Sequence, residues 1–128
     1  MAKTRKACSS RKSPRKAVCV LADNPNGVSG VIQMVEYRNG VKFTYDIKGL
    51  ADGEHGFHIH KCGDITKGCN SGCEHFNPYN KNHGSNNSKE RHIGDLGNIV
   101  SKNKIAKGKI VNNTISLDYN SKTCIIGR

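Results

Sequence analysis

Two histidines, His58 and His60, are separated by a single residue in the chain. Successive side chains of an extended strand point to opposite faces, so both imidazoles would lie on one face, roughly 6–7 Å apart. Two nitrogen ligands on one strand make half of a metal site. The rest of such a site must come from another part of the chain.

The segment after Lys61 loses its apolar periodicity for more than thirty residues, and Gly, Asn, Ser and Pro take over. A structureless loop of this length in a compact domain usually has a function, and metal coordination can order a loop that lacks its own core. Three histidines and one carboxylate suit tetrahedral zinc. The loop supplies this set as His75, His83, His92 and Asp95.

His75 lies in sequence between the strand pair and the later residues. The strand pair and a third imidazole form a nitrogen-only site, which suits copper as well as zinc. Neutral imidazole has two ring nitrogens, so one histidine can bridge two metals after it loses its second proton. His75 is the natural candidate for that bridge. His55 has an odd offset from His58 and is expected to be a packed structural histidine, while Lys89 and Arg91 are interpreted as solvated loop charges.

The elements that must position these residues are short strands, and no stretch shows a helical period. The turn Arg38-Asn39-Gly40 predicts a hairpin between the strands that flank it, because Asn-Gly favours a two-residue primed turn. Short strands with turn signals predict an all-β antiparallel sandwich or barrel. The predicted strands cover residues 17–22, 30–37, 41–48, a segment ending in His60, 96–101, 104–111 and 113–119.

The first sixteen residues carry seven Lys or Arg and no acid, so they hold most of the formal net charge of +11 and leave about +4 for the rest. Residues 1–16 are predicted to be a basic, disordered tail, and residues 17–128 a single domain. The alternative is that the tail binds nucleic acid or an anionic surface, or directs nuclear import.

The core is expected to be modest, because 34% of the residues are hydrophobic, 5% are aromatic and none is Trp. Stability should therefore depend on metals or crosslinks. No run of eighteen apolar residues predicts a membrane span, and no secretory signal is recognised, which favours a cytoplasmic, intracellular location. The six cysteines are expected to be reduced there.

Five stretches resemble the signature blocks of the copper/zinc superoxide dismutases, in the same order and at similar spacing: HGFHIHKCGD, GCNSGCEHFNP, KNHG, ERHIGDLGN and CIIGR. The segment KAVCVL is similar to the first strand of that family, so the resemblance covers residues 16–128. It implies a Greek-key, immunoglobulin-like β-barrel and the disproportionation of superoxide anion to hydrogen peroxide and oxygen. It also implies bound copper and zinc, a homodimer and a copper chaperone.

The resemblance assigns a role to each residue of the cluster. His58, His60 and His75 match the catalytic copper ligands, and Gly56 and His55 match positions that pack beneath the copper. Cys69 matches a loop cysteine that the family joins by a disulfide to its last strand. The implied zinc ligands are His75, which also binds the copper, His83, His92 and Asp95.

The sequence also departs from the family pattern. The family continues beyond CIIGR into strands that carry the fourth copper histidine, the active-site arginine and the partner of Cys69, so the final strands are expected to be missing. This leaves a second interpretation, a non-catalytic or weakly active metal-binding protein that sequesters metal or acts as a decoy. Cys62 and Cys73 are not part of the common pattern. One of them could form a local disulfide with Cys69 or contact a metal, and the alternative is that all are reduced.

Overall fold

Seven β-strands and no helix form in residues 12–22 and 24–128, the part of the chain that the computed structural model describes. All strand pairings are antiparallel, which confirms the all-β prediction. The strands are β1 (Lys16–Leu21), β2 (Ser29–Tyr37), β3 (Gly40–Lys48), β4 (Gly53–His58), β5 (Thr66–Cys69), β6 (Asp95–Ser101) and β7 (Ile105–Asn112).

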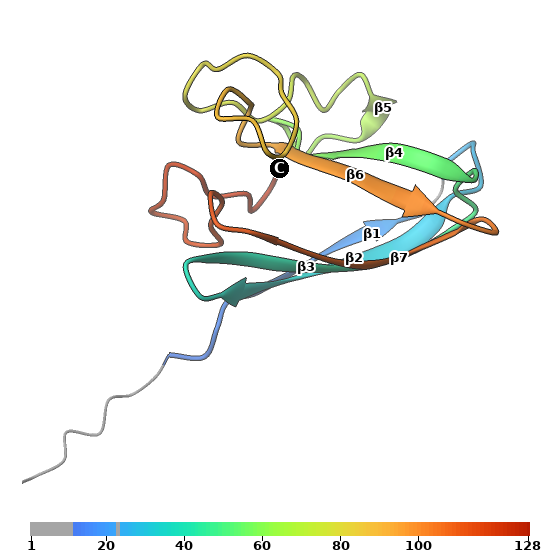
Figure 1. Ribbon diagram of the computed structural model, residues 1–128, viewed down its shortest axis with the longest axis horizontal. Coiled ribbons are helices and arrows are strands. Elements are labelled where there is room, and N and C mark those ends of the chain that lie inside the picture. The colour runs from blue at the N-terminus through green and yellow to red at the C-terminus, as the bar shows by residue number, and fades with distance from the viewer. Residues whose placement is uncertain (1–11, 23) are drawn as a thin grey trace, which may run out of the picture.

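The strands form a four-stranded sheet in the order β1-β2-β3-β7 and a two-stranded sheet of β4 and β6. The two sheets lie one above the other, and β5 lies beyond the edge of the smaller one (Figure 1). The chain crosses to the smaller sheet after β3 and returns after β6, so β7 pairs with β3. Such a return beside an earlier strand is the Greek-key pattern that the sequence predicted.

The predicted hairpin between β2 and β3 is confirmed, but its turn is one residue shorter than the predicted Arg38-Asn39-Gly40. Tyr37 pairs with Gly40, so the turn residues are Arg38 and Asn39. Arg38 takes the left-handed conformation, with φ of 53°. Gly40 pairs with Tyr37 as the first residue of β3. A glycine is required there, because a Cβ atom would overlap the backbone of Asn112 in the neighbouring β7.

The core between the sheets reaches the ends of both strands of the smaller sheet. Phe57 of β4 packs edge-to-face on Phe43 of β3, with ring centroids 5.9 Å apart. Leu96 of β6 is buried in the same cluster. Phe57 and Leu96 directly adjoin His58 and Asp95, so apolar packing anchors the strand ends that carry predicted ligands. The buried members of this cluster are Ile32, Val41, Phe43, Phe76, Leu96, Ile115, Leu117 and Ile125.

Residues 113–119 do not form a strand, and that prediction is wrong. Ile115 and Leu117 are buried, as the alternation suggested. Ser116 between them makes only an isolated parallel bridge, in which its amide donates to the Thr123 carbonyl at 3.1 Å and its carbonyl accepts from the Ile125 amide at 3.0 Å. The Ser116 hydroxyl also accepts a hydrogen bond from the Asp118 amide at 2.9 Å. Local side-chain acceptors of this kind compete with a strand ladder.

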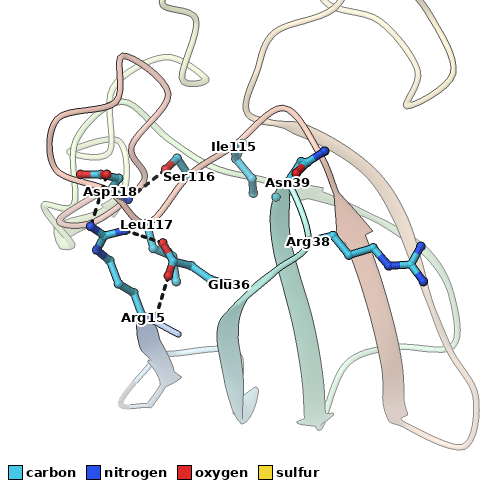
Figure 2. Close-up of a pocket in the computed structure, with 9 residues that line it drawn as sticks. Arg15, Glu36, Arg38, Asn39, Ile115, Ser116, Leu117 and Asp118 are labelled. Carbon is cyan, nitrogen blue, oxygen red and sulfur yellow. Dashed lines mark hydrogen bonds and ion pairs between the residues drawn. The ribbon is translucent and has the colours of Figure 1, made fainter. Parts of the chain in front are cut away.

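Arg15, assigned from sequence to the basic tail, is attached to the larger sheet. Its amide donates to the Glu36 carboxylate of β2 at 2.8 Å, and its guanidinium lies 2.6 Å from Glu36 and 3.3 Å from Asp118 (Figure 2). Residues 1–11 of the predicted tail lie outside the described residues. Within the described ranges, the structure has no helix of the length and hydropathy that a bilayer crossing needs.

Candidate metal centre

One end of the smaller sheet brings together residues that are far apart in the sequence. His58 is the last residue of β4 and pairs with Asp95, the first residue of β6. β4 therefore ends two residues earlier than predicted, and its pairing with β6 is irregular between Gly56 and His58. His60 instead faces His75 in an isolated antiparallel bridge. The loops that follow β4 and precede β6 gather at this end of the sheet (Figure 1).

The carboxylate of Asp95 is the buried centre of the cluster, with 1% of its side chain exposed. Its Oδ1 lies 2.9 Å from Nδ1 of His75 and 3.4 Å from Nδ1 of His92. Its Oδ2 lies 3.1 Å from Nδ1 of His83. Three imidazoles thus direct the same ring nitrogen toward one carboxylate.

Two backbone amides hold Asp95 in its charged form. Burial opposes ionisation, but the amides of Gly84 and His92 donate to Oδ2 at 3.2 and 3.0 Å, and His75 adds a further hydrogen bond. Together these bonds lower the pKa of Asp95 below its usual value. The carboxylate is therefore an anionic ligand at neutral pH.

His75 lies between two groups of side chains. Its ring stacks on His58 with centroids 4.1 Å apart and meets His60 edge-on at 5.2 Å. Its Nδ1 lies against Asp95 and is 3.4 Å from Nδ1 of His92. Burial and the neighbouring His75 lower the pKa of His58, which keeps that imidazole neutral and able to bind a metal.

A backbone carbonyl orients the His60 ring. Nδ1 of His60 lies 2.9 Å from the carbonyl oxygen of Cys73. A carbonyl only accepts, so Nδ1 carries the hydrogen and Nε2 keeps the lone pair that a metal needs. The His60 ring lies against the backbone of Gly72, and the His58 ring lies against the backbone of Gly56, where any larger residue would be in the way. A Cβ atom at Gly72 would lie 3.3 Å from the His60 ring, and one at Gly56 would lie 2.6 Å from Cε1 of His58.

The donor atoms fit a metal. One ligand atom from each of four residues lies within 4.8 Å of the others. Nδ1 of His75 and Nδ1 of His92 face each other at 3.4 Å, an arrangement that a shared cation satisfies better than two lone pairs do. Nitrogen and carboxylate oxygen suit zinc, and imidazole nitrogen suits copper as well. The four residues are His58, His75, His83 and Asp95.

The structure can be compared with the sequence predictions for the six candidate ligands and for their neighbours His55 and Arg91. The fold brings all six candidate ligands together, while His55 bonds to the carbonyl of Ala51 at 2.7 Å, as expected for a structural histidine. The interpretation of Arg91 as a solvated charge is wrong, because its guanidinium donates to the carbonyl of Asp95 at 2.9 Å. No sequence pattern indicated this contact, which depends on how the loop folds back.

The cysteines of the described part of the chain are free, Cys62 and Cys73 among them. Cys69, at the end of β5, is exposed and free among the described residues. The sulfur atoms that approach each other are those of Cys62 and Cys73, at 2.7 Å.

The sequence profile of the copper/zinc superoxide dismutase (SODC) family matches residues 28–128. The chain belongs to this family. Curated relatives of this superoxide dismutase-family chain include Superoxide dismutase [Cu-Zn] A of Xenopus laevis, 48% identical over 88% of the chain and 74% of the relative. A second is the Superoxide dismutase [Cu-Zn] of Paramecium bursaria Chlorella virus 1, 45% identical over 88% of the chain. The chain spans 60% of the length of that viral relative.

A solved structure has a similar fold. The crystal structure of the clock protein EA4 superimposes with a TM-score of 0.81 and is 38% identical in sequence. The match covers 91% of this chain and 73% of that one.

Proposed function

We propose that the chain disproportionates superoxide to hydrogen peroxide and oxygen. The observation that carries the proposal is the position of His75, which contacts His58 and His60 on one side and Asp95 on the other. One imidazole between two groups of ligands suits a pair of metals that share it. The proposed ligands are His58, His60 and His75 for copper, and His75, His83, His92 and Asp95 for zinc.

Bound copper would supply the one-electron oxidation and reduction of superoxide, because zinc has no redox chemistry. The chain's own residues supply position. The hydrogen bond between Asp95 and Nδ1 of His75 orients the ring, so that its other side faces His58 and His60. The Cys73 carbonyl keeps His60 in one tautomer throughout.

The charge of the molecule favours an anionic substrate. The chain has a formal net charge of +11, and a positive field raises the encounter rate of an anion in a manner that salt weakens. A quarter of the His75 side chain is exposed, so a small anion can reach the cluster. Rates of dismutation that fall as ionic strength rises would agree with this steering.

Other features of the assignment are proposals that rest on family membership. We propose a homodimer, delivery of copper by a chaperone, and a cytoplasmic location. We further propose that residues 1–14 act as a basic extension of the domain, since Arg15 and Lys16 of the predicted tail are bonded to β2. Size-exclusion chromatography with light scattering tests the first of these, since a monomer at micromolar concentration would contradict it.

Metal reconstitution with an activity assay tests the function. The chain is loaded with zinc alone, or with zinc and then copper, and bound metal and superoxide dismutation are measured. We expect about one zinc and one copper per chain, with dismutation only in the sample that holds copper. His55→Gln, outside the cluster, should behave like the parent chain. Full occupancy by both metals without turnover would overturn the proposal and favour metal sequestration or a decoy role.

A further inference from the structure

Two cysteines that the proposed mechanism does not use lie on either side of the ligand loop. Cys62 follows His60 by two positions, and Cys73 precedes His75 by two. Their sulfur atoms are 2.7 Å apart, although the residues are eleven positions apart in sequence. This separation is shorter than a contact between two unbonded sulfur atoms and longer than the about 2.05 Å of a disulfide. We propose that Cys62 and Cys73 form a reversible disulfide.

The backbone brings the two residues together before any bond forms. The amide of Lys61 donates to the carbonyl of Glu74 at 2.8 Å, and the amide of Cys62 donates to the carbonyl of Gly72 at 3.0 Å. Lys61 and Cys62 are adjacent, but their partners Glu74 and Gly72 are two residues apart. Cys73, between these partners, is therefore an extra residue without a counterpart on the first segment. An extra residue of this kind is a β-bulge, and it redirects its side chain.

The conformation of Cys73 supports a specific role for its side chain. Its φ is 65°, in the left-handed region that normally favours glycine. A cysteine at this position has an unfavourable backbone conformation that the surrounding structure must maintain. The bulge directs its sulfur to Cys62 and its carbonyl to the His60 ring.

A metal held by the two sulfurs fits less well than a covalent bond. A structural zinc takes four ligands, and the cluster of candidate ligand atoms found among the described residues contains histidines and Asp95 but no cysteine. Cys73 is exposed and Cys62 is partly exposed, so a soluble oxidant can reach them.

The bond can form by exchange with a small disulfide such as oxidised glutathione. One protein thiolate attacks the glutathione disulfide and releases one glutathione thiolate, which leaves a mixed disulfide. The second protein thiolate attacks the protein sulfur of that mixed disulfide, forms the Cys62–Cys73 bond and releases the second glutathione. The two cysteines lose two electrons and two protons, and two molecules of reduced glutathione receive them.

The bond would fix the support of a proposed copper ligand, and this consequence rests on the proposed function. The Cys73 carbonyl accepts the hydrogen bond from Nδ1 of His60, and the adjacent Gly72 lies against the same ring. Reduction would leave the bulge held by its backbone bonds alone. His60 would then lose the fixed acceptor that sets its tautomer. The disulfide is thus a redox-sensitive clamp on the bridge between His60 and His75.

Peptide mapping of the intact chain tests the bond without any metal. The chain is equilibrated in glutathione buffers of increasing oxidised fraction, its free thiols are alkylated, and it is cleaved with trypsin. We expect a crosslink between the peptides of residues 62–67 and 68–81, which reduction separates. The second peptide also contains Cys69, so Cys69→Ser serves as the control. It should keep the crosslink, whereas Cys73→Ser should lose it.

Two outcomes would overturn the disulfide. The first is full alkylation of Cys62 and Cys73 in every buffer, and the second is a crosslink that survives Cys73→Ser and disappears in Cys69→Ser. Neither outcome depends on metal binding, so failure of the disulfide and failure of the proposed dismutase function can be told apart.

Hydrogen exchange of the metal-free chain tests the clamp. The amides of Lys61 and Cys62 should exchange at least about tenfold more slowly in the oxidised chain than in the reduced chain. Cys62→Ser should exchange at the reduced rate in both buffers, and Cys69→Ser should follow the parent chain. Equal exchange of the oxidised and reduced parent chains would show that the bond does not restrain this segment, and would overturn the clamp.

Discussion

Asp95 is the residue on which the cluster depends. Its carboxylate accepts from two backbone amides and lies within 3.4 Å of three imidazoles, yet it is almost entirely buried. A buried charge of this kind is stable only with many hydrogen bonds or with a metal. The three facing histidines supply the ligands for such a metal, and the amides keep the carboxylate aimed at it.

Asp95→Asn should therefore reduce both zinc binding and stability. An amide group can accept only through its oxygen, so one buried donor is left without a partner, at a cost of about 1–3 kcal/mol in the free energy of unfolding. Zinc affinity should fall by at least about 100-fold, since even changes behind a ligand can cost that much. Competition with a zinc-binding dye and urea unfolding of the metal-free chain measure the two effects.

Asp64→Asn provides the matched control. Asp64 is also a loop carboxylate with hydrogen bonds, to the amide and hydroxyl of Thr66, but it is exposed and outside the cluster. Zinc affinity should be unchanged in this variant. Equal losses of zinc in both variants would mean that Asp95 acts only through general loop stability.

The ligand types, and the association of four of the six ligands with one loop, could be predicted at the residue scale because histidine is rare and its chemistry is specific. The backbone groups that hold the ligands in place could not be predicted. The acceptor of His60 is the carbonyl of Cys73, and backbone carbonyls have no signature in sequence. Arg91 likewise reaches the carbonyl of Asp95 only because the loop returns at that point.

At the scale of elements, strand ends position the cluster. The pairing of β4 with β6 places His58 opposite Asp95, and Phe57 and Leu96 fix both ends in the core. Gly94 allows the loop to join this sheet, because a Cβ atom there would overlap the backbone of Ile59. The site is therefore built on packed strand ends, with the long loop closing over them.

Alternation of apolar residues identified the strands but not all of their partners. Burial of Ile115 and Leu117 has the period of a strand, yet Ser116 between them pairs only in an isolated bridge with residues 123–125, so the segment does not extend into a strand. The prediction that Gly40 belongs to the turn was wrong for a related reason. Gly40 is needed for close approach to β7, a contact between segments that are distant in sequence.

An ion pair joins the start of β1, β2 and the segment after β7. The Arg15 amide and then the Arg15 guanidinium lower the pKa of Glu36 below its ordinary value, and Asp118 also faces the guanidinium (Figure 2). A carboxyl whose pKa is lower in the folded chain stabilises the fold above its unfolded pKa of about 4.3. This contribution is lost as the pH falls through the lower, folded value.

Glu36→Gln should accordingly be less stable than the parent chain at pH 7, and the difference should shrink below about pH 4.3. Urea unfolding at a series of pH values measures it. Glu90→Gln is the control, because the Glu90 carboxylate has no hydrogen bond or ion pair within the described part of the chain. The free energy of unfolding of this variant should equal that of the parent chain at each pH. A difference for Glu36→Gln that stays constant into acid would contradict the ionic origin.

At the scale of the whole molecule, two sheets of unequal size form a Greek-key sandwich, and loops at one end hold the ligand cluster. The order of motifs allowed this architecture to be predicted through family resemblance, because spacing between ligands reflects the strands between them. The formal net charge of +11 also acts at this scale, because net charge attracts an anion over long distances, although residues 1–16 carry seven of the positive charges.

The central claim is that one histidine serves two metals, and metal content of matched histidine variants tests it most directly. Copper and zinc per chain are measured by mass spectrometry for the parent, His75→Ala, His83→Ala and His55→Gln after identical loading. The account predicts that His75→Ala loses both metals, that His83→Ala chiefly loses zinc, and that His55→Gln keeps both. A His75→Ala chain that keeps its full copper, or loses no more metal than His83→Ala, would contradict it.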